Sequence, residues 1–115
     1  MSMSNASETN LLNLLFNNVD WPNVGDAAGL QNSATAGSFY VALHTADPGD
    51  AGNQTTNEVS YTGYARVAVA RSAGGFTVSG ANVSNTATVQ FGECTAGAAT
   101  AASTTFAGGI EVVWG

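Results

Sequence analysis

In several segments that begin at residue 39, the apolar side chains of this sequence recur at every second position, which is the period of a β-strand. Phe39, Val41 and Leu43 form one such row, and a similar alternation returns over residues 65–71. Successive side chains of a strand point to opposite faces, so each segment is predicted to be a strand with one face on a core. The two strands are expected to pair, and the chain is expected to be mainly β.

Three later segments extend this pattern. Phe76 and Val78 predict a short strand that ends at Gly80, and residues 83–91 show the clearest alternation in the chain, broken only at Asn85. A further strand is predicted at 109–115, whereas the low-complexity tract 92–104 is predicted to be a loop.

The first part of the chain has a helical period. Apolar side chains over residues 5–19 fall on one helical face, which predicts a short amphipathic helix. Asn5 and Glu8 are three residues apart, as in a capping box with asparagine in place of the usual hydroxyl residue. Trp21 precedes a proline and is pushed out of the α region, so the helix is expected to finish near Val19.

Two segments lack any hydrophobic period and are predicted to be long loops, residues 23–38 and 46–58. The second contains Asp-Pro-Gly, in which Pro48 presets φ for one central turn position and Gly49 accepts a positive φ at the next. Loops this long in a small domain tend to make contacts or to be functional.

A chain of 115 residues fits one domain. The predicted division is an N-terminal helix and arm, residues 1–22, followed by a single β domain, residues 23–115. The predicted fold class is a small antiparallel β-sandwich or barrel-like domain with one N-terminal amphipathic helix.

The charge balance limits the partners. Only 9% of residues are charged, and eight acidic residues against two arginines and no lysine give a formal charge of −6. Such a field repels phosphate, so nucleic-acid binding is not expected. No apolar run approaches the ~20 residues needed to cross a bilayer, and no membrane association is expected.

No catalytic, cofactor or metal site is predicted. His44 lacks the nucleophile motif that a hydrolase triad would require, and no glycine-rich phosphate loop is present. Asp47, Asp50 and Glu58 offer oxygens that calcium prefers, but their spacing departs from the EF-hand pattern and a turn is the favoured reading. The single cysteine, Cys94, is read as a small buried hydrophobe.

The remaining candidates are contact residues. Arg66 and Arg71 are the only cations beside eight carboxylates, so each is expected to pair with Asp or Glu, within or between subunits. Aromatic residues are enriched in interface cores. The predicted interface residues are Leu11, Leu12, Leu15, Phe16, Trp21, Arg66, Arg71 and Trp114.

The order of motifs over about residues 8–95 resembles a family of small tailed-phage virion structural proteins, often labelled tail fibre. The motifs are LLNLLF (11–16), YVALHT (40–45), ADPGDAG (46–52), NEV (57–59), YAR (64–66) and SNTATVQF (84–91). The resemblance implies a non-enzymatic virion component, assembled in the bacterial cytoplasm, whose partners are sister copies and other capsid or tail proteins. A homo-oligomer is expected.

Three placements compete. An outer capsid decoration protein is ranked first, because an acidic, lysine-free domain suits a position away from packaged DNA. A tail-fibre or tail-tip protein is second, since no repeats or stalk signature are visible, and a small phage hydrolase is a distant third.

The C-terminus departs from the family pattern, because GIEVVWG ends the chain where further strands would follow. The sheet would then have an unpaired edge, which a neighbouring subunit could cover by adding a strand.

Overall fold

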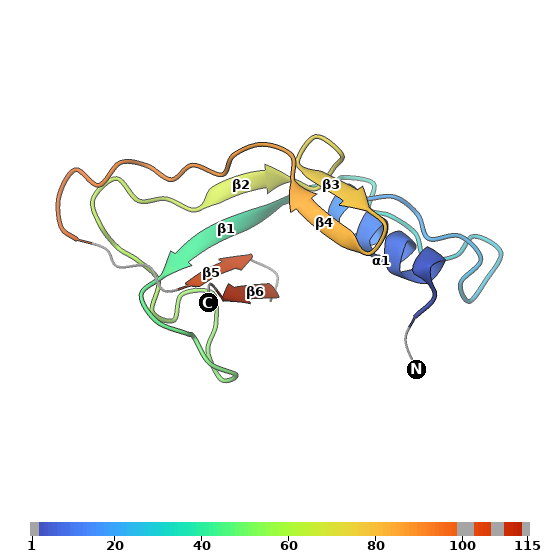
Figure 1. Cartoon of the computed structure of the whole chain (residues 1–115), viewed down its shortest axis with the longest axis horizontal. Coiled ribbons are helices and arrows are strands. Elements are labelled where there is room, and N and C mark those ends of the chain that lie inside the picture. Colours follow the sequence, from blue (N-terminus) through green and yellow to red (C-terminus); the bar gives the residue numbers. More distant parts are fainter. Residues whose placement is uncertain (1–2, 99–102, 107–109, 114–115) are drawn as a thin grey trace. The chain divides into compact units, whose positions relative to one another are not determined.

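The structure, a computed structural model, describes residues 3–98, 103–106 and 110–113. In this part of the chain one helix precedes six strands (Figure 1). They are α1 (Asn5–Asn17), β1 (Ser38–His44), β2 (Val67–Ala70), β3 (Phe76–Ser79), β4 (Asn82–Asn85), β5 (Ser103–Phe106) and β6 (Ile110–Val113). The predicted mainly-β class with an N-terminal helix is confirmed.

The strands form two open sheets. One has the order β2-β1-β5-β6, and the other is the hairpin β3-β4. β1 pairs antiparallel with β5, with Val41 opposite Phe106 and His44 opposite Ser103, and β5 pairs antiparallel with β6. β1 and β2 are neighbours in the four-stranded sheet. This confirms the predicted pairing of the two strands at the ends of residues 39–71. Neither sheet closes into the barrel that was one predicted alternative.

The chain divides into two compact units. Unit 1 comprises Met1–Ser38 and Val69–Thr88, and unit 2 comprises Phe39–Ala68 and Val89–Gly115. This division differs from the one predicted from the sequence, residues 1–22 and 23–115. Compactness does not decide which segments fold independently, so the predicted domain boundary stays a prediction.

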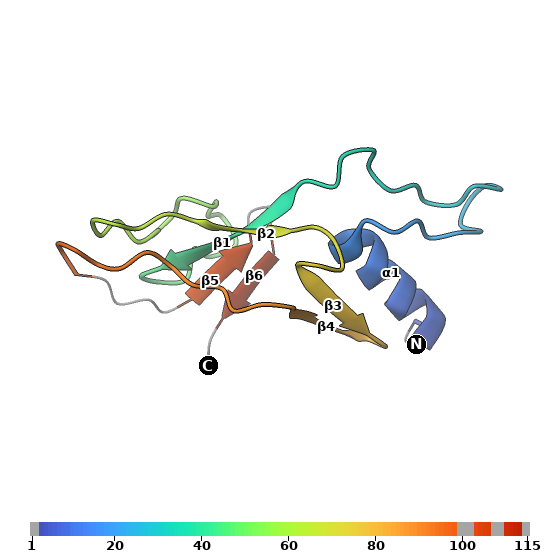
Figure 2. The same ribbon diagram turned by 90° about the horizontal axis from the view of Figure 1, so that it is seen from above.

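Unit 1 is built from α1 and the β3-β4 hairpin, which lie side by side (Figure 2). Phe16 of α1 meets Phe76 of β3 edge to face, with ring centroids 5.0 Å apart, and both rings are buried. Thr9 Oγ1 also donates a hydrogen bond to the Gly80 carbonyl at the hairpin turn (2.9 Å). An edge-to-face pair adds about 1 kcal/mol to the burial of the two rings.

The ends of α1 differ from the prediction. Ser4 is the N-cap, because its side chain accepts a hydrogen bond from the Ser7 backbone N–H (3.3 Å), so the predicted cap at Asn5 is wrong. The helix ends at Asn17, since Asn18 adopts a left-handed conformation with φ 56°. Asparagine tolerates this conformation better than most residues, which ends the helix two residues before the predicted position.

Unit 2 has its core around the second half of β1. Val41 and Ala42 are buried, as is Val59, and His44 is 0% exposed. The expected one-sided alternation is therefore wrong for Ala42 and His44. The reason is a backbone return: His44 forms an antiparallel bridge with Glu58, and the Val59 N–H donates to the Leu43 carbonyl (2.9 Å).

Two predicted boundaries after residue 82 are also wrong. The strand predicted at 83–91 is β4, Asn82–Asn85, because the Asn85 side-chain amide donates to the Ala87 carbonyl (2.6 Å) and turns the chain. The predicted loop 92–104 includes the start of β5. The strand predicted at 109–115 is confirmed as β6, Ile110–Val113.

Candidate functional site

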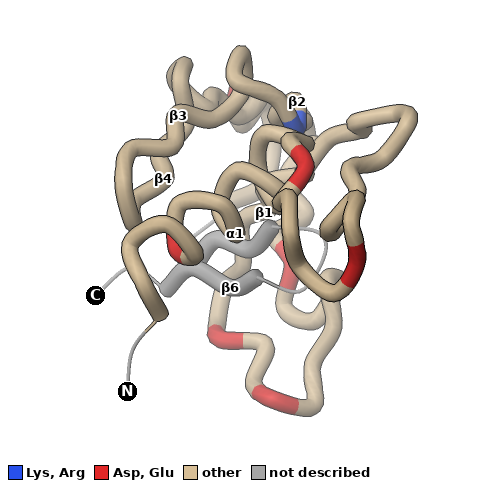
Figure 3. Tube along the Cα trace, turned by 90° about the vertical axis from the view of Figure 1, so that its right-hand side faces the viewer, with Lys and Arg blue, Asp and Glu red and all other residues tan. Residues whose placement is uncertain are grey.

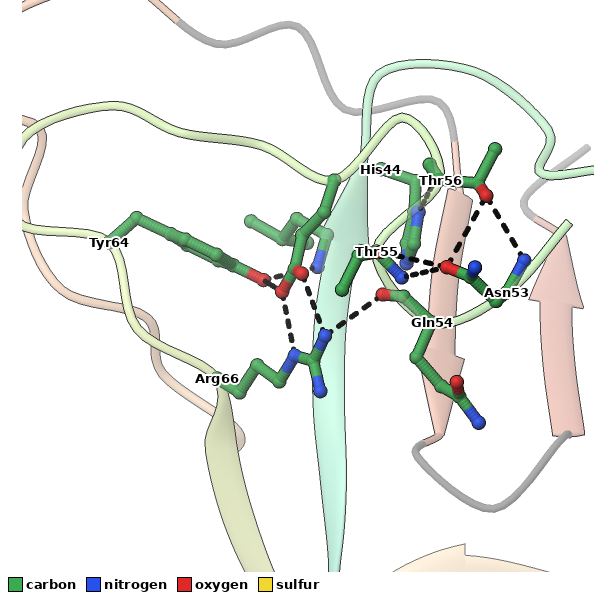
Figure 4. A network of polar contacts seen from close by, with 9 residues as sticks. His44, Asn53, Gln54, Thr55, Thr56, Tyr64 and Arg66 are labelled. Atoms are coloured by element: carbon green, nitrogen blue, oxygen red, sulfur yellow. Dashed lines mark hydrogen bonds and ion pairs between the residues drawn. The ribbon is translucent and has the colours of Figure 1, made fainter.

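Arg66 connects the long loop of unit 2 to its core. Its Nε donates to Glu58 Oε1 and its Nη2 to Glu58 Oε2, both at 2.7 Å, so the pair is bidentate (Figure 4). The same Nη2 donates to the Gln54 carbonyl at 3.0 Å. Bidentate arginine–carboxylate bonds are charge-assisted and fix geometry as well as adding energy. The predicted pairing of Arg66 with an acidic residue is confirmed within the chain.

Tyr64 joins this pair to the sheet. Its hydroxyl donates to Glu58 Oε1 (2.8 Å) and accepts a hydrogen bond from the Leu43 backbone N–H (3.1 Å). The chain between Val59 and Val67 is not part of any strand, so the hydroxyl replaces a strand neighbour for Leu43. We call Glu58, Tyr64, Arg66 and the Gln54 carbonyl the Arg66 anchor.

The electrostatics of the Arg66 anchor favour the charged pair. The Arg66 guanidinium lowers the pKa of Glu58 below its ordinary value, although partial burial opposes this, and the hydrogen bond from Tyr64 lowers it further. Burial raises the pKa of Tyr64 to about 12, with a further contribution from its bond to Glu58. The bond with Glu58 also raises the pKa of Arg66.

The loop held by this anchor is internally hydrogen-bonded. Asn53 Oδ1 accepts bonds from the Thr55 backbone N–H (2.9 Å) and hydroxyl (2.7 Å), and the Thr56 hydroxyl accepts from the Asn53 N–H (3.0 Å). At the start of the loop, Asp47 Oδ1 accepts from the Gly49 N–H (2.7 Å), and Gly49 has the positive φ, 69°, that the Asp-Pro-Gly turn predicts.

His44 has a structural position in this site. Its Nδ1 lies 2.7 Å from the Thr56 carbonyl oxygen, which only accepts, so Nδ1 carries a proton and donates. Asp47 and Glu58, two of the three residues considered for calcium, have partners in Gly49 and Arg66. Across residues 3–98, 103–106 and 110–113, no three His, Cys, Asp or Glu side chains are grouped to hold a metal ion.

Arg71 fixes the long loop of unit 1, as Arg66 fixes that of unit 2. Its Nε donates to the Leu15 carbonyl (2.7 Å), its Nη2 to the Leu14 carbonyl, and its Nη1 to the Ser33 hydroxyl (3.1 Å). The carbonyls at the end of a helix lack partners within it and carry partial negative charge. Among the described residues, Arg71 binds carbonyl and hydroxyl oxygens. Its predicted pairing with a carboxylate, within or between subunits, stays a prediction. We call Arg71, Leu14, Leu15 and Ser33 the Arg71 anchor.

The loop beside the Arg71 anchor is closed by its own hydrogen bonds. Trp21 and Leu30 exchange two backbone bonds of 2.9 Å. Asn18 Oδ1 accepts from the Ser33 N–H (2.9 Å), and Asp20 Oδ1 accepts from the Asn32 N–H (2.7 Å). The predicted irregular loop is thus an ordered excursion.

One glycine is required for this closure. Gly29 has φ 73°, and a Cβ there would meet the Trp21 carbonyl oxygen at 2.1 Å. Only glycine allows both this conformation and this approach.

The predicted interface residues fall into different environments. Leu15 is exposed, whereas Leu11, Leu12 and Trp21 are half-buried. Phe16 packs inside unit 1, and Arg66 and Arg71 bind groups of their own units. Trp114 lies outside the described residues. The set stays a prediction as an interface.

Sequence reasoning missed Tyr64 as a bridging residue and missed the exposed Val19 and Leu30. The spacing of the NEV and YAR motifs was the available signal for the Glu58–Tyr64–Arg66 group. Cys94, expected to be buried, is exposed.

The acidic residues lie in several separate segments (Figure 3). Over residues 3–98 and the described strands that follow, no helix has the length and apolarity to cross a membrane.

Comparison with known proteins identifies one family. The family model described as podophage GP4 fiber I protein gp80 matches residues 2–108. Comparisons with curated proteins and with solved structures find no match. This match confirms the resemblance to phage virion structural proteins that the motifs indicated. The family is one of structural proteins of a phage particle. The chain belongs to the podophage GP4 fiber I protein gp80 family.

Proposed function

We propose that this chain is a non-enzymatic, fibre-associated component of the phage tail. The family description names a fibre protein, which supports the tail-fibre placement over the capsid decoration ranked first from the sequence. The capsid placement rested on an acidic, lysine-free composition, and that composition suits any outer position on the particle.

The observation that carries the non-enzymatic, passive part of this proposal is the pair of arginine anchors. Each anchor fixes a long polar loop onto the unit to which that loop belongs. The two anchors use the only two Lys or Arg side chains of the chain. A loop already ordered before it meets a partner loses less conformational entropy on binding. The two loops are then passive contact surfaces on a small β framework.

The hydrolase alternative gains no support from His44 or Glu58. His44 is 0% exposed and its Nδ1 is held by Thr56, so a substrate has no access to the ring. The carboxylate of Glu58 is bound by Arg66 and Tyr64 and is held in its ionised form. These positions suit a structural role for both residues.

The partners we propose are sister copies and neighbouring virion proteins. A formal charge of −6 opposes contact with nucleic acid. The proposed location is the assembled particle, after synthesis and assembly in the bacterial cytoplasm.

Labelled-antibody electron microscopy of intact particles tests the placement. Antibody raised against the purified chain is expected to decorate the tail and to leave the capsid unlabelled. Label distributed over the capsid shell would restore the decoration placement and contradict a tail-fibre role. Particles from which the gene for the chain is deleted serve as the control for antibody specificity.

A further inference from the structure

Residues 60–66 of unit 2 belong to none of the named strands, yet they contact two other parts of that unit. We call them the Tyr64 segment. The side chains of Tyr64 and Arg66 hold the loop 46–58 through the Arg66 anchor. The backbone of the Tyr64 segment bonds with residues 91–97, which we call the paired segment.

The paired segment is joined to the Tyr64 segment by hydrogen bonds. The Thr62 N–H donates to the Ala96 carbonyl and the Thr95 N–H donates to the Thr62 carbonyl, both at 3.0 Å. Thr62 and Ala96 form an antiparallel bridge. The Tyr61 hydroxyl also donates to the Gly92 carbonyl at 2.7 Å. These bonds join two segments that are far apart in the sequence.

Two glycines let the backbones of these segments approach each other closely. A Cβ at Gly92 would lie 2.1 Å from the Gly63 carbonyl oxygen, and a Cβ at Gly63 would lie 2.2 Å from that of Glu93. Side chains other than hydrogen do not fit at such distances. The sequence is therefore matched to this contact on both sides.

Tyr64 takes part in both contacts of its segment. Its ring stacks on Phe91, with centroids 6.1 Å apart, and meets the Tyr61 ring edge to face at 5.5 Å. Its hydroxyl binds Glu58 Oε1 and the Leu43 backbone N–H (Figure 4). One end of this rigid side chain therefore lies against the paired segment, and the other end holds the loop.

We propose that the paired segment and the loop 46–58 gain and lose order together, through Tyr64. When residues 91–97 are displaced, the Tyr64 ring loses its stacking partner Phe91, and its segment loses its backbone partners. Because the ring is rigid, a shift of the ring also moves the hydroxyl away from Glu58. Proteins open locally in contiguous units of this kind, below the free energy of global unfolding.

The coupling acts in both directions, as linkage requires. Order in the loop favours order in the paired segment, and a partner that takes up the paired segment alters the order of the loop. That loop is one of the two proposed contact surfaces. The coupling lies within unit 2, so it does not depend on whether the particle carries the chain on its tail or its capsid.

Hydrogen exchange of Gly92→Ala in the full chain tests this coupling. The new Cβ separates the paired segment from the Tyr64 segment without removing a side chain. The amides of Thr62 and Thr95 are expected to exchange faster, since their bonds cross this contact. The amides of Thr56 and Glu58, in the loop, are expected to exchange about tenfold faster or more, because the loop opens with the segment.

Tyr64→Phe separates a coupled opening from two independent ones. It keeps the ring that stacks on Phe91 and removes the hydroxyl that holds the loop. In this background, Gly92→Ala is expected to accelerate Thr62 and Thr95 alone. In the opposite direction, Arg66→Ala opens the loop and is expected to accelerate the same two amides in a chain that retains Tyr64.

Gly74→Ala in unit 1 is the matched control, because a Cβ there meets its nearest atom, Ser72 Oγ, at an ordinary 3.5 Å. It should leave exchange in unit 2 unchanged. If Gly92→Ala unfolds the whole chain or leaves Thr62 and Thr95 protected, Phe91→Ala decides in its place.

Faster exchange in the paired contact without faster exchange in the loop overturns the proposal. So does a loop that Gly92→Ala opens equally with and without the Tyr64 hydroxyl. The proposal also fails if Arg66→Ala opens the loop while Thr62 and Thr95 keep their exchange rates.

Discussion

The two units use the same residue type to fix a loop, but the chemistry of the contact differs. In unit 2, Arg66 meets a carboxylate that also binds a tyrosine hydroxyl. In unit 1, Arg71 meets backbone carbonyls and a serine hydroxyl. A carboxylate titrates and carries a full charge, whereas a carbonyl does neither. The order of the loop of unit 2 is therefore expected to depend on pH and on its ion pair. The order of the loop of unit 1 is expected to depend on hydrogen bonds to uncharged groups.

The largest effect is expected from the core of unit 1. Phe16→Ala removes the ring that packs on Phe76, and a cavity of this kind costs about 3 kcal/mol in the free energy of unfolding. Urea denaturation measures the loss, and hydrogen exchange should locate it in α1 and the β3-β4 hairpin. Phe16→Leu, which refills most of the volume, is the control. Equal loss of protection in unit 2 would break the separation of the two units.

The next effect is expected from the Arg66 anchor. Arg66→Ala leaves the Glu58 carboxylate, which is 16% exposed, without its cation, at a cost of about 2 kcal/mol. Arg66→Lys keeps the charge but cannot make two parallel bonds, so it should recover only part of the loss. Urea denaturation of both variants provides the comparison. Full recovery in the lysine variant would show that charge alone matters here.

A smaller effect is expected from the Arg71 anchor. Arg71→Ala removes donors to the helix end and to Ser33, and each such site is partly open to water, so we expect about 1 kcal/mol. Thermal unfolding followed by helical circular dichroism measures it. A larger loss than for Arg66→Ala would reverse the order of the two anchors and contradict their assignment as charged and neutral contacts.

The smallest effect is expected from pH. Because the folded pKa of Glu58 lies below its ordinary value of 4.5, its contribution is complete above that value and is lost as pH falls through the folded pKa. Tyr64, with a pKa raised to about 12 from an ordinary value of 10.0, contributes fully below pH 10 and loses this as pH rises to about 12.

These two pH effects have separate controls. Glu58→Gln should remove the acid-side dependence, and Tyr64→Phe the alkaline-side dependence, in urea denaturation across the pH range. If the free energy of unfolding of Glu58→Gln falls with decreasing pH as steeply as that of the unchanged chain, another carboxylate causes the acid-side dependence.

The sequence predicted the elements that depend on local pattern. The helix predicted at residues 5–19, the pairing of β1 with β2, and the positive φ at Gly49 all follow from period or turn chemistry. Features that depend on distant partners were not predictable in the same way. Ala42 and His44 are buried because residues 56–59 return along β1, and no periodicity within β1 signals that return.

The contacts of the candidate site were also predictable only in part. The pairing of Arg66 with an acidic residue was expected from the scarcity of cations, and the structure identifies Glu58 as the partner. The same reasoning did not anticipate the groups that Arg71 binds within the described chain, the carbonyls at the end of a helix. Composition indicates that an arginine will find a partner, but the fold decides which one.

The central claim is that each arginine fixes one loop. Hydrogen exchange of Arg66→Ala and Arg71→Ala, compared with the unchanged chain, tests it most directly. Arg66→Ala is expected to release the amides of Thr56 and Glu58 and to spare those of Leu30 and Ser33. Arg71→Ala should show the opposite pattern. If both variants release the same amides, or neither releases its own loop, the account is contradicted.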